Sequence, residues 1–262
     1  MNQLHIAFDK THVTVETDVP EAVDFVKRTF VHMLSDCAPQ PIATIRFSAD
    51  SHGYSLSAPE SAEIKDEWLE HMTGLLKDEV RHQFIRARSD LLWLHSGAVE
   101  RNGGARLICG PSGAGKSTLT TMLCERGWRL LSDDVVPIRM DADSALPFAH
   151  APSRRLRPLR FLTQIELNGV KREEMNFDRK SIRHSAAPIR DIVFPVFADA
   201  EESLSLMSSA EATMELLRSS MNFAAHRANA VARAARLASS VPAYRLVYQS
   251  ARSAVDLIEQ LG

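Results

Sequence analysis

The chain has 262 residues, which is enough for one large domain or for a main domain with a smaller one. Its 31 Lys and Arg residues nearly balance its 33 Asp and Glu residues, so the overall charge gives no reason to expect nucleic acid or an anionic membrane as a partner. The three cysteines, Cys37, Cys109 and Cys124, are odd in number and far apart, which argues against a disulfide framework or a zinc site.

The beginning of the chain, MNQLHIAFDK, lacks a basic region followed by an apolar stretch. Nowhere do about 18 apolar residues follow one another without interruption, as a membrane-spanning helix would require. We therefore expect a cytoplasmic protein that has no contact with a membrane.

The first 90 residues show patterns typical of a small α/β domain. Short alternating stretches predict strands at 4–8, 12–17, 43–49 and 53–58. Periodic apolar residues predict an amphipathic helix over 19–34, and a charged helical stretch follows over 61–88. Residues 1–90 contain no recognisable catalytic pattern, so we expect this domain to serve recognition or assembly.

Residues 91–262 alternate between apolar strands and helices, which favours a larger α/β domain. The expected strands are 91–100, 105–110, 128–132, 191–197 and 243–248, and apolar stretches at 135–140 and 146–150 flank the turn DADS. Helices are expected over 116–126, over an alanine-rich run at 209–239 and from Ser250 onward. The segment 152–190 reads as irregular and basic.

The sequence GPSGAGKST lies between the strand at 105–110 and the helix at 116–126, as a phosphate-binding loop does. It satisfies the pattern G-x-x-x-x-G-K-[ST], in which backbone N–H groups bind phosphates, the lysine neutralises phosphate charge and the hydroxyl binds Mg²⁺. The start of the helix adds its positive dipole. The predicted nucleotide-binding residues are Gly110, Pro111, Ser112, Gly113, Ala114, Gly115, Lys116, Ser117 and Thr118.

Two acidic residues, Asp133 and Asp134, follow the strand at 128–132. Neighbouring carboxylates at such a place can divide two tasks, one holding Mg²⁺ and the other accepting the proton of an attacking hydroxyl. Taken by themselves, such neighbouring aspartates more often end a strand or begin a turn. His95, at the end of an apolar run, is by its local pattern more often a buried structural side chain than a functional one.

The run from His95 to Asp134, HSGAVERNGGARLICGPSGAGKSTLTTMLCERGWRLLSDD, resembles the catalytic core of the HPr kinase/phosphorylase family. That family combines a histidine before a strand, a phosphate loop, an RG-x-RL stretch and paired aspartates, and all four occur here in the same order. The resemblance implies an HPr-kinase-type P-loop domain, which has a phosphoenolpyruvate carboxykinase-like fold, over 91–262 after the small α/β domain.

The resemblance also implies roles for individual residues. Asp133 corresponds to the catalytic acid or base, Asp134 and Ser117 to metal ligands, and His95 and Lys116 to side chains at the reacting centre. ATP and Mg²⁺ are the implied cofactors. The implied reaction moves the γ-phosphoryl group to a hydroxyl, and we expect that hydroxyl to belong to a Ser or Thr of a protein or peptide. We also expect the enzyme to be a homo-oligomer.

The sequence departs from the bifunctional members of this family in two places. Their Leu-Glu-x-Arg-Gly signature has as its nearest counterpart IELNGV at 165–170, which includes Glu166 but lacks the arginine. The resemblance therefore does not extend to phosphorylase activity. Residues 1–90 do not resemble the usual N-terminal domain of the family, so it does not extend to recognition of HPr either.

The arginine-rich stretch SRRLRPLR follows the paired aspartates. Arginine recognises phosphate and carboxylate groups through its planar, permanently charged guanidinium. Arg154, Arg155 and Arg157 are therefore candidates for contacts to the acceptor or to the transferred phosphoryl group, although such a run can also be a solvated loop.

Two alternative functions fit the same motifs. A small-molecule hydroxyl kinase would need no peptide acceptor, and its first domain would serve assembly. A nucleotide-gated binding module would use ATP as a structural ligand without phosphoryl transfer. Measurement of turnover separates these alternatives.

Overall fold

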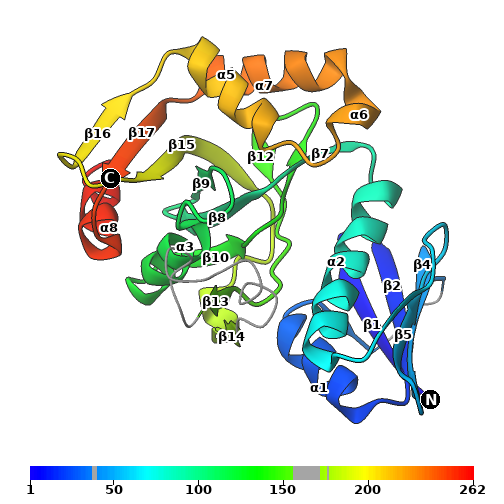
Figure 1. Cartoon of the computed structure of the whole chain (residues 1–262). Coiled ribbons are helices and arrows are strands. Elements are labelled where there is room, and N and C mark those ends of the chain that lie inside the picture. Colours follow the sequence, from blue (N-terminus) through cyan, green and yellow to red (C-terminus); the bar gives the residue numbers. More distant parts are fainter. Residues whose placement is uncertain (37–39, 156–171, 176) are drawn as a thin grey trace. The chain divides into compact units, whose positions relative to one another are not determined.

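The computed structural model describes residues 1–36, 40–155, 172–175 and 177–262, and they form two compact units (Figure 1). Unit 1 takes in Met1–Arg88 and Ser153–Asn176, and unit 2 takes in Ser89–Pro152 and Phe177–Gly262. Grouping into compact units does not test whether each folds independently. The division into domains at 90/91 therefore stays a prediction.

Unit 1 contains a six-stranded sheet in the order β3-β1-β2-β4-β5-β6. The strands are β1 (Asn2–Phe8), β2 (Thr11–Thr17), β3 (Leu34–Ser35), β4 (Ala43–Asp50), β5 (Gly53–Ser57) and β6 (Ile64–Asp66). Helix α2 (Leu69–Ala87) packs against β2, β4 and β5, and α1 (Pro20–Thr29) packs against α2, β1 and β2. The four strands predicted for this part are confirmed.

Both predicted helices of unit 1 are shorter than expected, because strand pairing takes part of each predicted range. The helix expected over 19–34 ends at Thr29, since Leu34 and Ser35 pair with β1 as strand β3. The helix expected from 61 begins at Leu69, because β6 pairs with β5. The Asp66 carboxylate then accepts a hydrogen bond from the backbone N–H of Trp68, at 2.8 Å, just before the helix.

Unit 2 is built on a nine-stranded sheet with helices on both faces (Figure 1). Its main path runs β10-β8-β9-β15-β12-β11-β7, while β17 pairs with β15 and β16 with β17. The strands are β7 (Leu91–Leu94), β8 (Ser96–Arg101), β9 (Gly104–Cys109), β10 (Arg129–Ser132), β11 (Val136–Arg139), β12 (Ser144–Ala145), β15 (Ala187–Phe197), β16 (Ser203–Leu206) and β17 (Ala243–Tyr248). A separate two-stranded sheet, which belongs to unit 1, pairs β13 (Ser153–Arg155) with β14 (Arg172–Glu174).

Two hydrophobic clusters hold the helices against the large sheet. One joins α5 (Ser209–Arg218) and α7 (Ala228–Ser240) to residues of β7, β9, β11 and β15. The other joins α3 (Lys116–Glu125) and α8 (Ala251–Glu259) to residues of β8, β9, β10 and β17. Helices α3 and α8 therefore share one face of the sheet, and α5 and α7 the other.

Three adjacent strands of this sheet, β9, β15 and β17, run parallel. A buried ion pair joins the first two, because Arg106 Nε and Nη2 donate to the two carboxylate oxygens of Asp191 at 2.5 and 2.8 Å. Arg106 is fully buried, and its Nη1 also donates to the carbonyl of Ile258. Parallel strands end at the same edge of a sheet, so the segments that follow β9, β15 and β17 lie along one edge.

One sequence expectation for unit 2 is corrected by pairing elsewhere in the sheet. The single strand expected over 91–100 is two strands, since β7 pairs with β11 whereas β8 pairs with β9 and β10. The apolar stretch 146–150 contains an isolated bridge between Phe148 and Ser132, and strand β12 precedes it at Ser144–Ala145.

The alanine-rich run is three helices, α5, α6 (Phe223–His226) and α7, instead of one. The segment after α5 hydrogen-bonds to β7: Met221 N–H donates to Trp93 O, and the Asn222 side chain bonds to both Trp93 N–H and Leu91 O. Arg227, with φ of 47°, then separates α6 from α7. The bond from Met221 uses a backbone N–H that a continuous helix would need for itself.

Among the helices of the described ranges, none is both long enough and apolar enough to span a bilayer.

Candidate functional site

The predicted phosphate loop joins β9 to α3. Gly113 and Gly115 have φ of 86° and 87°, in the left-handed region that glycine adopts without steric cost. The helix begins at Lys116, and the N–H of Leu119 donates to the carbonyl of Gly115 in its first turn. The strand, loop and helix predicted from the sequence are thereby confirmed as secondary structure, whereas binding of a nucleotide stays a prediction.

The start of α3 has the electrostatic character of an anion site. The first N–H groups of an α-helix have no partner within the helix, and the helix dipole places positive charge there. Pro111, Ser112 and Gly113 are exposed, while Ser117 and Thr118 are partly exposed. The loop can therefore be reached by a phosphate group from solvent.

Lys116 lies at the centre of a connected set of polar groups. Its Nζ donates to the carbonyl oxygens of Gly110 and Pro111, at 2.8 and 3.0 Å, and lies 3.0 Å from His95 Nε2. The side chain is thus held over the loop by the loop's own carbonyls. The ammonium group is the positive charge that can neutralise phosphate in this loop.

His95 connects Lys116 to the paired aspartates. Its Nδ1 lies 2.9 Å from the backbone oxygen of Asp134 and 3.1 Å from the carboxylate Oδ1 of the same residue. The His95 and Asp134 side chains are 35% and 27% exposed, so both are accessible from solvent. His95 lies between β7 and β8, where the chain changes strand partners, and its N–H donates to Ser219 O at 2.7 Å.

The two aspartates differ sharply in environment. Asp133 is only 1% exposed, whereas Asp134 has φ of 67° and directs its carboxylate toward His95. Asp133 lies beside Gly97: a Cβ on that glycine would stand 3.6 Å from Asp133 Oδ1 and 2.2 Å from Thr120 Oγ1. Because a Cβ at 2.2 Å is a steric clash, any larger residue at this position would require the Thr120 side chain to move.

The fit of Mg²⁺ depends on oxygen donors near the loop. Within the described residues, no group of three or more His, Cys, Asp or Glu side chains is arranged to hold a metal. Mg²⁺ usually keeps several waters and takes one or two protein oxygens together with substrate phosphates, so it needs no such cluster. The Asp134 carboxylate and the Ser117 hydroxyl are of the donor type that suits it.

The other residues singled out in the sequence are three arginines and Glu166. Arg154 and Arg155 lie in β13, and Arg157 and Glu166 lie outside the described residues. The proposed contacts of Arg154, Arg155 and Arg157 to an acceptor or a phosphoryl group stay predictions.

Sequence reasoning missed two side chains beside the loop, Thr120 and Tyr248. Thr120 is buried in the second turn of α3, and the Tyr248 hydroxyl donates to Ala114 O at 2.9 Å. Neither belongs to the phosphate-loop pattern. Tyr248 lies 134 residues after Ala114 in the chain, so no local signal could have marked it.

The described structure defines a mixed α/β protein with two large sheets and a glycine-rich loop at the start of a helix. Comparisons with known protein families and with curated protein sequences found no match. Among solved structures, the chain is similar to the Hpr(Ser) kinase/phosphatase from Coxiella burnetii, with 14% sequence identity and a TM-score of 0.34. The match covers 64% of this chain and 92% of that one, and the likeness is distant and partial.

Proposed function

We propose that this protein is an ATP- and Mg²⁺-dependent kinase that moves the γ-phosphoryl group to a hydroxyl, with a Ser or Thr of a protein or peptide as acceptor. The observation that carries the proposal is the connection of Lys116, on the glycine loop, through His95 to Asp134. A cation, an imidazole and a carboxylate meet at the N-terminus of a helix, where phosphate binds favourably.

The proposed reaction forms one phosphorus–oxygen bond and breaks another. The acceptor oxygen forms a bond to the γ-phosphorus as the bond from that phosphorus to the bridging oxygen of ADP breaks, and the hydroxyl proton passes to a carboxylate. Lys116 and the loop N–H groups bind the phosphates, and Asp133 is the proposed proton acceptor. Asp134 and Ser117 would hold Mg²⁺, which neutralises phosphate charge when bound.

The near-complete burial of Asp133 bears on this division of roles. A proton acceptor must come within hydrogen-bond reach of the acceptor hydroxyl, directly or through one water. Asp134 is the more accessible carboxylate here, and His95 orients it. The assignment of Asp133 to proton transfer therefore requires the acceptor to reach below the surface, and variants of both residues decide it.

The experiment that tests the function is transfer of labelled γ-phosphate from ATP with Mg²⁺. The acceptors offered are a Ser/Thr peptide library and, separately, a set of hydroxyl metabolites. We expect label in peptides, and none with Lys116→Ala. Label in metabolites alone would replace the proposal by a small-molecule kinase. Tight ATP binding without any transfer or hydrolysis would replace it by a nucleotide-gated module.

The proposed function also assigns a role to residues 1–90 and an oligomeric state to the protein. We propose that residues 1–90 serve recognition of the acceptor or assembly, and that the enzyme is a homo-oligomer. Light scattering after size-exclusion chromatography measures the mass against the 29.1 kDa of one chain. A monomer at all concentrations would reject the homo-oligomer.

A further inference from the structure

Tyr248 stands at the end of β17, on the same sheet edge as the phosphate loop. The loop follows β9, and β15 lies between β9 and β17 in the sheet. The Tyr248 side chain reaches across the end of β15 to the loop, where its hydroxyl donates to the carbonyl of Ala114 at 2.9 Å. The residue is 3% exposed, so this hydrogen bond is shielded from water.

The close packing of Gly115 against Tyr248 is a second observation that connects the loop to this tyrosine. A Cβ on Gly115 would stand 2.1 Å from the Tyr248 hydroxyl oxygen and 3.3 Å from Cζ. The space that a side chain at 115 would need is therefore filled by the tyrosine. Burial raises the pKa of Tyr248 above its ordinary value, which keeps the hydroxyl protonated as a donor.

We propose that Tyr248 is a positioning residue for the phosphate loop, whose hydroxyl fixes the peptide between Ala114 and Gly115 in the orientation that binds phosphate. A trans peptide is planar, so its C=O and N–H point in opposite directions. By holding the Ala114 carbonyl, Tyr248 directs the Gly115 N–H to the other side of the loop backbone. This inference rests on the proposed nucleotide-binding function.

Contacts on both sides of β17 hold Tyr248 itself in place. Its ring packs edge-on against Phe197, with centroids 5.4 Å apart, and its carbonyl accepts from the N–H of Ala198. The next residues are held by the Glu202 carboxylate, which accepts from Gln249 N–H at 2.9 Å and from the Ser253 hydroxyl at 2.5 Å. The tyrosine therefore reaches the loop from a fixed strand end.

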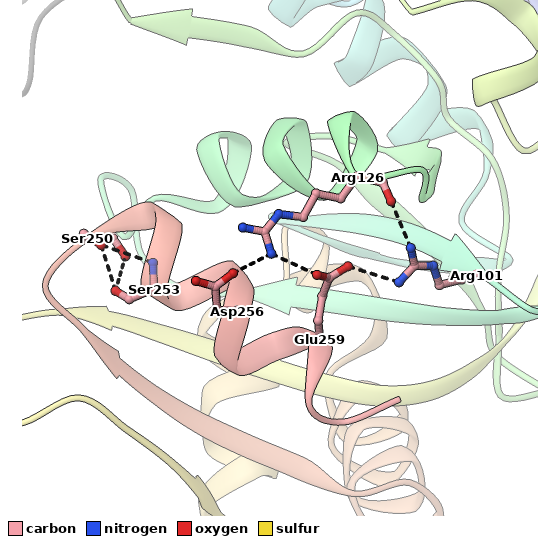
Figure 2. A network of polar contacts seen from close by, with 6 residues as sticks. All are labelled: Arg101, Arg126, Ser250, Ser253, Asp256 and Glu259. Atoms are coloured by element: carbon pink, nitrogen blue, oxygen red, sulfur yellow. Dashed lines mark hydrogen bonds and ion pairs between the residues drawn. The ribbon is translucent and has the colours of Figure 1, made fainter.

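The helix that follows Tyr248 holds the opposite end of α3. The Arg126 guanidinium, just after α3, lies between Asp256 and Glu259 of α8, at 2.6 and 2.9 Å, and Glu259 also accepts from Arg101 (Figure 2). The segment from β17 to α8 thus contacts α3 at both ends, through Tyr248 at its start and through Arg126 at its finish.

The first test compares the Kd of the full chain for MgATP, by isothermal titration calorimetry, in wild type and Tyr248→Phe. The variant keeps the ring and removes only the hydroxyl. We expect the Kd to rise roughly three- to tenfold, the equivalent of one neutral hydrogen bond. Tyr244→Phe is the matched control on the same strand and should leave the Kd unchanged.

A merely structural role is separated by measuring urea unfolding of the same variants. Such a role would lower stability while the folded protein kept its Kd. A wild-type Kd for MgATP in Tyr248→Phe would therefore overturn the inference about Tyr248 and leave the proposed function standing. A wild-type chain that binds no MgATP overturns the proposed function together with the inference, so the two failures are distinguishable.

The second test uses the close approach at Gly115. Gly115→Ala should weaken MgATP binding at least tenfold, because its Cβ meets the tyrosine oxygen and its φ is unfavourable for alanine. In the Tyr248→Phe background that oxygen is absent, so the added loss from Gly115→Ala should be smaller. If the losses of MgATP-binding free energy in the two single variants add up to the loss in the double variant, the two residues do not share a contact.

Discussion

Lys116 Nζ and His95 Nε2 lie 3.0 Å apart, in a contact where the ammonium group can only donate and the imidazole nitrogen must accept. The proton of the ring is then on Nδ1, which faces the backbone and carboxylate oxygens of Asp134. One histidine tautomer therefore satisfies the lysine and the aspartate together.

His95→Ala should lower kcat roughly tenfold to a hundredfold, because Lys116 and Asp134 lose the ring that fixes them relative to one another. Lys116 keeps its bonds to Gly110 and Pro111, so the Kd for MgATP should change only a few-fold. Steady-state kinetics and calorimetry measure the two effects. His184→Ala, at an exposed histidine of the same unit, is the control, and equal kcat in both variants would remove His95 from the mechanism.

Lys116→Ala should abolish turnover and weaken MgATP binding by roughly ten- to a hundredfold, since the loop loses a charge-assisted bond to phosphate. Calorimetric titration gives the Kd. Lys180→Ala is the matched control, because that lysine is largely exposed and pairs with Asp178. Wild-type affinity in Lys116→Ala would show that the nucleotide binds elsewhere.

Asp133→Asn and Asp134→Asn should each lower kinase activity, but for different reasons. Asp133→Asn removes a basic oxygen at constant size, so kcat should fall by roughly 10² to 10⁴ with MgATP still bound. Asp134→Asn should raise the Mg²⁺ concentration needed for activity, and excess metal should partly restore it. Activity measured across a Mg²⁺ titration distinguishes them. Rescue by metal at 133 and not at 134 would exchange the two roles.

Glu259→Gln should destabilise the protein by up to about 1 kcal/mol at neutral pH, the range of exposed ion pairs. The hydrogen bond from Arg126, with smaller contributions from Trp128 and Arg101, holds the pKa of Glu259 below its ordinary value of 4.5. A lowered folded-state pKa contributes stability above the unfolded-state pKa, and that stability is lost as pH falls through the folded-state pKa.

The difference in unfolding free energy between wild type and Glu259→Gln should therefore be full above about pH 5 and shrink below 4.5. Urea unfolding at several pH values measures it. Glu201→Gln, at an exposed position, serves as the control. A difference that stays constant down to pH 3 would mean that the carboxylate charge is not the cause.

Cys109 and Cys124 should resist alkylation in the folded protein at pH 8. Burial raises the pKa of both thiols to about 12, and the thiolate is the reactive form. Mass spectrometry after iodoacetamide treatment should find neither residue modified without denaturant and both modified in urea. Fast labelling of Cys124 in the native state would indicate that α3 opens locally, since its thiol packs against the sheet.

The glycine-rich loop and its flanking strand and helix could be predicted as secondary structure because their signals are local. The glycines, Lys116 and the apolar strand before them lie within a dozen residues, and the helix start needs no distant partner. Asp133 and Asp134 could be placed at a strand end for the same reason. The resemblance supplied His95, which its own neighbourhood marks only as a residue in an apolar run.

Features that depend on distant pairing could not be predicted. The break after α5 comes from bonds of Met221 and Asn222 to β7, which lies about 130 residues earlier in the chain. The contact of Tyr248 with Ala114 depends on the order of β9, β15 and β17 in the sheet. Local patterns carry no information on such an order, because it is set by tertiary packing.

The backbone of Asp134 implies a trade-off between activity and fold stability. Its φ of 67° is a conformation that glycine adopts freely and that costs a residue with a side chain roughly 1 kcal/mol. Selection for stability alone would favour glycine there, at the expense of the carboxylate beside His95. Under the proposed kinase function, a stabilised form of this protein obtained without screening for turnover would therefore tend to lose activity first at residue 134.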